Sequence, residues 1–346
     1  MAYTTIKKPS DYFNTKLYTG NGSTQNITGV GFQPDWVWTK CRSTINSHRL
    51  IDAVRGVTKA IVSNSTGAEF TETNGLSAFG ADGYTLNGNL ASMNTNGDTY
   101  ASWNWLANGA GAANTDGTIS STVSANTTSG FSIVSWAGNS TAGSTIGHNL
   151  GVAPKMIIVK DRDGADSWVV YHNSLAVTEY MVLNSTLAAQ TDNEIIFYDT
   201  KPTSSVFTVG AHNTVNQSGH NYIAYCFAEK QGFSKFGSYT GNGNADGAFI
   251  YTGFKPSFIM YKKSSGTGRW TMEDNKRDPF NVATHGLEAN GNSVENTGSN
   301  YWDVDLLSNG FKLRTTEQET NQSGQTFIYM AFAEQPLVGD NPATAR

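Results

Sequence analysis

Two aspartate–arginine pairs have the residue types and spacing that come nearest to a functional site. Asp52 is followed three residues later by Arg55, and Asp274 by Arg277, and each aspartate lies 18 residues beyond a proline that leads an apolar segment. A carboxylate and a guanidinium at this separation can form a bidentate ion pair. Such a pair either pins the turn after a strand or contacts a ligand, and we favour the structural role.

Other patterns that could bind a metal, a cofactor or a nucleotide are incomplete. Residues 242–247 begin like a calcium loop but have Gly253 where the bidentate glutamate is required, and residues 161–164 have His172 at that place. The six histidines are scattered, without a His-x-x-x-His pair, and no Cys-x-x-Cys is present. Residues 109–114 lack the third glycine of a dinucleotide fingerprint. We therefore expect no metal, no cofactor and no catalytic residue.

The elements that must position the two pairs belong to a sequence repeat. An aromatic residue followed by Thr or Ala and then Gly stands 16, 18 or 17 residues before a proline, and the apolar segment after each proline ends in lysine. A period of about one hundred residues suits a small domain better than a solenoid unit. The pattern predicts three related modules in tandem. Their landmarks are Tyr18 and Pro34, Trp136 and Pro154, and Tyr239 and Pro256.

Within each module the sequence predicts short antiparallel strands. Partial alternation of apolar and polar residues, frequent glycine-bearing turns and few stretches with a 3.6-residue period all favour strands. The predicted fold class is all-β, with three tandem antiparallel β-sandwich or partly open barrel modules of about one hundred residues and little helix. One short helix is expected between residues 174 and 184. Residues 172–175 stand where the outer modules carry their aspartate–arginine pair, so the middle module is the exception.

The repeats also divide the chain. We expect an N-terminal attachment arm, three modules with a linker after the first, and a polar C-terminal tail. The linker is rich in Gly, Ala and Thr, although residues 117–120 could add an edge strand to the second module. Modules two and three meet with almost no linker and should pack rigidly. The predicted ranges are 1–17 for the arm, 18–107, 131–230 and 231–336 for the modules, 108–130 for the linker and 337–346 for the tail.

Composition argues against several classes of protein. Aromatic residues make up 12% of the chain, so it should fold, and the net charge of −5 without a basic run argues against a nucleic-acid surface. No apolar run is long enough to span a membrane, and the first eight residues lack the apolar stretch of a secretory signal. Cys41 and Cys226 fall in different modules and indicate no disulfide framework. We expect a soluble protein made in the cytoplasm.

Several longer phrases carry a resemblance to a known family. They are residues 48–59, 147–160, 225–229 and 236–243. Over nearly the whole chain, from about Tyr18 to Glu334, the sequence resembles a recurrent virion structural or tail-fibre-like protein of marine and cyanobacterial tailed bacteriophages. The resemblance implies a β-rich virion component, often linked to the tail or its fibres, with no catalytic motif to carry over. The chain departs from a typical long fibre in lacking heptads, collagen-like repeats and a β-helical shaft.

Three functional hypotheses follow. The first is a bacteriophage virion structural protein of the tail or tail fibre, which adheres to the host surface through multivalent weak contacts. The second is a head decoration or cement protein that stabilises the capsid, its three modules imitating a trimer at a local threefold axis. The third is a surface polysaccharide-degrading enzyme, which would need two carboxylates in one groove. Because acids are few and no pair is evident, we expect a protein that is not an enzyme.

The expected partners follow from the first two hypotheses. They are other virion proteins, such as a tail or fibre hub or the capsid, together with a host-surface glycan or protein. Further copies of the chain are also expected, as a homo-oligomer. We expect neither nucleic-acid binding nor membrane insertion, and a location in the virion after synthesis in the host cytoplasm.

Overall fold

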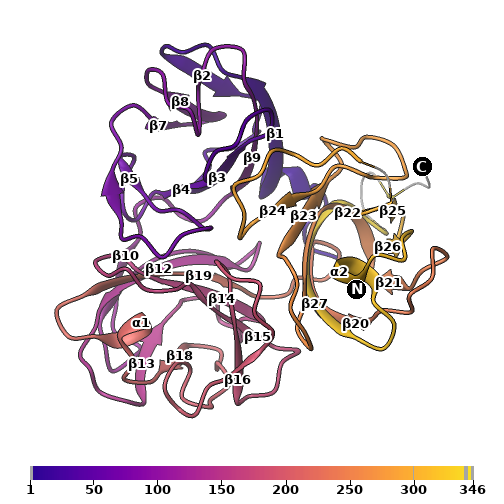
Figure 1. Ribbon diagram of the computed structural model, residues 1–346. Helices are drawn as coiled ribbons and strands as arrows, with labels where there is room; N and C mark the ends of the chain where they lie inside the picture. The colour runs from indigo at the N-terminus through magenta and orange to yellow at the C-terminus, as the bar shows by residue number, and fades with distance from the viewer. Residues whose placement is uncertain (1–2, 299, 339–341, 344–346) are drawn as a thin grey trace.

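The computed structural model describes residues 3–298, 300–338 and 342–343, and it shows three β lobes arranged around a common centre (Figure 1). The chain is all-β, built from several antiparallel sheets, as the sequence predicts. In the part that the structure describes, α-helix is confined to Asn213–Asn216 (α1) and Gln318–Asn321 (α2), beside a 3₁₀ turn at Pro9–Asp11 (η1). None of the described sheets closes into a barrel, so each module is a small sandwich.

The inner sheet of each module contains four strands in the same order: opening, closing, proline-led and third strand; further strands extend it in modules two and three. The last strand of each module therefore lies between its first two. In module one these strands are β1 (Phe13–Thr19), β9 (Thr99–Trp105), β3 (Trp36–Cys41) and β4 (Arg49–Asp52). In module two they are β12 (Phe131–Ala137), β19 (Asn221–Phe227), β14 (Met156–Asp161) and β15 (Val169–His172). In module three they are β20 (Ser234–Thr240), β27 (Thr326–Pro336), β22 (Phe254–Lys263) and β23 (Thr271–Asp274).

A smaller sheet covers the outer face of each inner sheet. In module one it is β2 (Gln25–Thr28), β8 (Gly83–Leu86) and β7 (Leu76–Gly80). In module two it is β13 (Ser144–Gly147) with β18 (Val206–Val209), and in module three β21 (Phe249–Tyr251), β26 (Gly310–Leu313) and β25 (Val304–Leu307). A short strand pair follows the third strand of the first two modules, namely β5 (Lys59–Ala60) with β6 (Phe70–Thr71), and β16 (Glu179–Val182) with β17 (Gln190–Thr191). In module three, β24 (Leu287–Glu288) pairs with β23.

The aromatic landmarks stack across the opening and closing strands. Tyr18 faces Tyr100 with ring centroids 5.1 Å apart, Trp136 faces Tyr222 at 5.3 Å, and Tyr239 faces Phe327 at 4.9 Å. Two residues after each of these aromatic landmarks, the strand passes so close to the backbone of another turn that only glycine fits. A Cβ atom there would lie 2.2 to 2.3 Å from a carbonyl oxygen of the polar turn before the closing strand: Gly20 beside Thr95, Gly138 beside Gln217, and Gly241 beside Gln322.

Replacing Gly241 with alanine is expected to destabilise the protein by about 1 to 3 kcal/mol, because the new methyl group would meet the backbone oxygen of Gln322 and force the turn to move. The free energy of unfolding in urea measures the effect. Gly67→Ala is the matched control, since only the Ser65 hydroxyl lies near its Cβ, at 3.3 Å. Equal stability of the two variants would contradict this account of the repeat.

The proline landmarks occupy positions where the sheet does not need a backbone N–H donor. Pro34 and Pro154 lie just before β3 and β14. Pro256 lies inside β22, at a shift in its register with β27. After each proline, residues on both faces of the strand are buried, as the uniform burial of β3 and β14 shows. A strand buried on both faces needs a covering layer on each side.

The inner faces of the three sheets share one core. Trp36 of module one stacks on Tyr225 of module two, with ring centroids 4.0 Å apart, and Phe13 of module one stacks on Phe332 of module three at 4.8 Å. Phe227 of module two contacts Phe332 at 6.0 Å. These rings belong to a single buried cluster drawn from all three modules. Each module also has its own outer core, so the modules are parts of one body rather than separate beads.

The modules contact one another in a closed head-to-tail ring. The residue before each third strand donates a ring N–H to a backbone oxygen of the preceding module. Trp168 donates to Val62 O, Trp270 to Val182 O and His48 to Glu288 O, each at 2.9 Å. Module one thus meets two, two meets three, and three returns to one. Heterologous contacts of this kind close into a ring when the rotation permits.

The lysines at the ends of the apolar segments lie inside this ring. Lys40, Lys160 and Lys262 are fully buried. Lys160 donates to Thr66 O of module one and Gly164 O, both at 3.1 Å, and Lys262 donates to Thr186 O of module two at 2.8 Å. Burial lowers the pKa of Lys40 and Lys160 to about 8 and that of Lys262 to about 7. Lys160 and Lys262 therefore hold the neighbouring module by its backbone, whereas Lys40 donates to Cys41 O of its own module at 2.6 Å.

Three expectations about the chain need correction. The expected linker at 108–130 is part of module two, because β10 (Ala112–Asn114) and β11 (Ser121–Asn126) extend its sheet next to β12. The expected arm at 1–17 is not free over its described residues. Ile6 and Phe13 are buried in the shared core, and the Tyr3 hydroxyl donates to Gly253 O at 2.6 Å.

The third correction concerns the expected helix. Between residues 174 and 184 the chain forms a turn and β16 in place of the short helix. Of the expected tail at 337–346, residues 339–341 and 344–346 lie outside the described part, and β27 runs to Pro336.

Candidate functional site

The structure brings each predicted aspartate and arginine together as a fully buried ion pair. Arg55 Nε lies 2.5 Å from Asp52 Oδ2, and Arg277 Nε lies 2.6 Å from Asp274 Oδ2. In both pairs the aspartate also accepts the backbone N–H of the arginine, at 2.9 and 3.0 Å. Arg55 donates further to Leu50 O at 2.9 Å. Each pair thereby fixes the turn that follows its third strand.

Each pair also extends into a neighbouring module. The Tyr225 hydroxyl of module two donates to Asp52 at 2.8 Å, and Trp103 Nε1 of module one donates to Asp274 at 3.1 Å. Glu69 bonds both Arg55, at 3.2 Å, and Arg162 of module two, at 2.9 Å. We call such a linked set a clasp. The first clasp comprises Asp52, Arg55, Glu69, Arg162 and Tyr225, and the second Asp274, Arg277, Glu295, Arg42 and Trp103.

The charges of the clasps are mutually compensated. Burial alone would lower the pKa of Arg55, but the neighbouring charges of Asp52, Tyr225 and Glu69 raise it. Burial would raise the pKa of Glu69, but its bonds to Arg162 and Arg55 lower it. A buried network whose members are paired in this way stays charged at neutral pH. The clasps therefore join modules through charges that satisfy one another.

Module two lacks an aspartate–arginine pair because its interface with module three is built differently. Position 330, which corresponds to Trp103 and Tyr225, is a methionine and has no donor for an aspartate. His172 replaces the aspartate and contacts the backbone oxygen of Tyr329 at 3.1 Å. The remaining clasp positions are Leu175, Ala189 and Ser264, and the first two pack against the shared core. All five positions differ from those of the two clasps, and none of them carries an aspartate, glutamate or arginine at this third interface.

Sequence reasoning missed the second arginine and the glutamate of each clasp. Arg42 and Arg162 each lie eight residues after a landmark proline, so this constant spacing was a usable signal. Glu69 and Glu295 lie 35 and 39 residues after theirs, because loops of different length intervene. No fixed spacing could have aligned the two glutamates.

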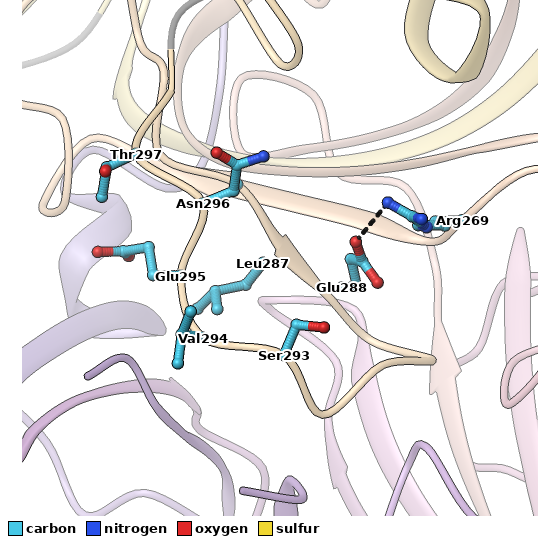
Figure 2. Close-up of a pocket in the computed structure, with 9 residues that line it drawn as sticks. Arg269, Leu287, Glu288, Ser293, Val294, Glu295, Asn296 and Thr297 are labelled. Carbon is cyan, nitrogen blue, oxygen red and sulfur yellow. Dashed lines mark hydrogen bonds and ion pairs between the residues drawn. The ribbon is translucent and has the colours of Figure 1, made fainter. Parts of the chain in front are cut away.

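A polar pocket opens in module three, beside its contact with module one. It has a volume of about 410 Å³ and lies between β24, Arg269 and the loop 293–297 (Figure 2). We call it the Arg269 pocket. Arg269 Nη1 lies 2.9 Å from Glu288 Oε1 at one side, and Asn296 stands on the loop opposite. Leu287, which is 2% exposed, also lines the pocket, so an apolar residue borders the charged pair.

The pocket is open because small or short residues replace larger ones of the other modules. Gly286 and Asn296 exchange two backbone hydrogen bonds of 3.0 Å. The corresponding pairs are Ala60 with Phe70 in module one and Tyr180 with Gln190 in module two. Each of those pairs contains a large aromatic ring. Gly286 itself could not carry a side chain, since a Cβ there would lie 2.5 Å from the Trp302 ring.

The charged groups around the pocket are balanced. Arg269 faces Glu288 and, at 3.6 Å, Glu319. Burial raises the pKa of Glu288, and the nearby Glu319 adds to this while Arg269 opposes it. Glu295 bonds Arg42 and Arg277 at 2.7 and 3.1 Å, and in Figure 2 its carboxyl group points away from the Arg269–Glu288 pair.

The two carboxylates of the pocket differ in their surroundings. Glu288 and Glu295 both line the pocket, which makes them the carboxylates that a glycoside hydrolase would use here. Glu295 is held by Arg42 and Arg277, and its carboxyl group points away from the Arg269–Glu288 pair (Figure 2). Among the described residues, no group of three His, Cys, Asp or Glu side chains is placed to hold a metal ion, and no helix is long and apolar enough to cross a membrane.

Comparison with known proteins places the whole ring in one family. A family model described as "Domain of unknown function (DUF7483)" matches residues 8–336. The chain belongs to this family. Searches of curated proteins and of solved structures found no match. The match to DUF7483 begins before β1 and ends with β27, so the family's unit is the set of three modules and not the single module.

Proposed function

We propose that the protein is a bacteriophage virion structural protein of the tail or tail fibre, and that it adheres to the host surface. The observation that carries the proposal is a ring of three modules locked by one shared core, with an open polar pocket on module three. A rigid body of this kind presents its outer loops in fixed positions. The resemblance to tail-fibre-like phage proteins supports the same role.

Adhesion would depend on several copies acting together. A shallow polar pocket provides a weak single site, and linking many such sites on one particle raises their effective concentration. In the structure, the binding sites of one chain would be held at fixed distances from one another. Since the three modules share a core, their spacing is set by packing and not by flexible linkers.

The experiment that tests adhesion uses the purified full chain. We expect it to bind host cells at micromolar concentration and to reduce phage adsorption when added in excess. Antibody labelling of intact virions, viewed by negative-stain microscopy, should place the chain on the tail or its fibres. Absence of cell binding, or label confined to the capsid shell, would contradict the proposal.

A head decoration protein is the second candidate, and the ring arrangement favours it specifically. Three non-identical modules in a closed head-to-tail ring imitate a trimer. Such a body could sit at a local threefold axis of a capsid and stabilise it. In this case label would appear over the whole head, and virions lacking the protein should lose DNA at lower temperature than complete virions.

A further inference from the structure

We propose that the Arg269 pocket binds a neutral saccharide through two adjacent hydroxyl groups. The inference rests on the proposed adhesive function, because it names the ligand class that the adhesive surface recognises. Its starting point is the paired guanidinium and carboxylate of Arg269 and Glu288, whose atoms lie 2.9 Å apart at the side of the pocket.

A guanidinium next to a carboxylate matches the hydrogen-bonding pattern of a vicinal diol. Arg269 supplies N–H donors only, and ionised Glu288 supplies acceptors only. Each hydroxyl group of a diol can accept from the first and donate to the second. Asn296 adds an amide from the loop opposite (Figure 2): its Oδ1 already accepts from the N–H of Gly298 at 2.9 Å, and its NH2 group can donate to a ligand. Bonds to charged partners are the stronger kind, which suits hydroxyl groups that must leave water.

The charge balance selects a neutral ligand. The positive charges of Arg269, Arg42 and Arg277 are opposed by those of Glu288, Glu319 and Glu295. A phosphate or carboxylate ligand would compete with these glutamates for the arginines, and a cation would meet Arg269. The apolar side of a sugar ring has matching surface in Val294, which is 43% exposed at the pocket.

The other two modules act as internal controls for this assignment. Glu288 corresponds to Val62 and Val182, since the backbone oxygens of all three accept the ring N–H that closes the ring of modules. That contact needs only the carbonyl group, so a valine serves it equally well. Arg269 likewise corresponds to Ser47 and Ser167, which precede His48 and Trp168. The ion pair is therefore an addition that the architecture does not require.

The test measures binding of defined sugars to the full chain. Saturation-transfer NMR and calorimetry should detect D-mannose, D-galactose or their oligomers, while sialic acid and inorganic phosphate should not bind. Glu288→Val, which installs the residue of modules one and two, and Arg269→Met should each weaken binding by about tenfold or more. Arg314→Met is the matched control, because it removes an exposed arginine of the same module that pairs with Asp305 away from the pocket.

The outcomes separate this inference from the proposed function. No binding of any neutral sugar, preference for the anionic probes, or unchanged affinity in both pocket variants overturns the saccharide site. If the wild-type chain still binds host cells in that case, adhesion stands and uses another surface. If sugars bind and both variants lose them while cell binding is absent, the site is supported and the adhesive role fails. Unfolding midpoints within about 2 °C of wild type would show that the variants are folded.

Discussion

Replacing Arg55 with leucine should lower the free energy of unfolding by about 3 to 5 kcal/mol. The substitution leaves Asp52 and Glu69 without the guanidinium that joins them, and the Asp52 side chain is fully buried. An uncompensated buried carboxylate is among the most destabilising changes that a single substitution can produce. Denaturation in urea, followed by tryptophan fluorescence, measures the loss.

The third interface of the ring supplies the matched control. It holds His172, Leu175, Ala189, Ser264 and Met330 at the five clasp positions, so an uncharged set is compatible with this architecture. Transplanting that set into the first interface should recover most of the stability lost in Arg55→Leu. The five changes are Asp52→His, Arg55→Leu, Glu69→Ala, Arg162→Ser and Tyr225→Met. A quintuple variant less stable than the single variant by several kcal/mol would show that the clasp is more than a replaceable link.

Acid should destabilise the protein from pH 6.5 downward. Burial lowers the pKa of His48 to about 3, with the charge of Lys40 adding to the effect, and lowers the pKa of His172 to about 4. In the unfolded chain these histidines are protonated below about pH 6.5, whereas in the folded protein they stay neutral until about pH 4 and pH 3. The free energy of unfolding therefore has its full value above about pH 6.5 and decreases as the pH falls towards 4 and then 3. The slope is up to about 1.4 kcal/mol per pH unit for each histidine.

The structure shows why His48 must stay neutral and which variant tests this. Trp38 Nε1 donates to His48 Nδ1 at 2.8 Å, so that atom accepts, and Nε2 carries the proton given to Glu288 O. Glutamine can supply one acceptor and one donor without titrating. His48→Gln together with His172→Gln should flatten the plot of unfolding free energy against pH between 6.5 and 5. An unchanged slope in the double variant would assign the acid sensitivity to other groups.

The repeat could be read from the sequence because its landmarks obey local rules. The stacked pair of Tyr18 and Tyr100, the tight contact at Gly20 and the bulge at Pro256 each depend on the residue type at a fixed place in a strand. Local geometry of this kind repeats with the sequence. That the three modules pack around one shared core was harder to predict from the repeat. The run Trp36-Val37-Trp38, however, is apolar on both faces of a strand, and this already indicates a covering layer on each side.

The prediction of a linker was wrong because it relied on the composition of the segment. The segment 108–130 is small and polar, yet Val123 is buried and β11 forms a six-residue ladder with β12. Tertiary pairing outweighs weak local preference in such strands. The Arg269 pocket could not be predicted at all. It exists because Gly286 and Asn296 face each other across a loop of irregular length, and this juxtaposition has no counterpart in sequence spacing.

The position of each closing strand governs when the protein can fold during its synthesis. β27 is made after the other described strands, and it lies inside its sheet, between β20 and β22. Phe332 on this strand contacts Phe13, which is synthesised more than 300 residues earlier. At about 5 to 20 residues per second, the chain between Trp105 and Phe332 takes on the order of 10 to 50 seconds to complete. Until Phe332 is made, Trp105 lacks this neighbour in the shared core, so the nascent chain exposes apolar surface that aggregation or chaperones can capture.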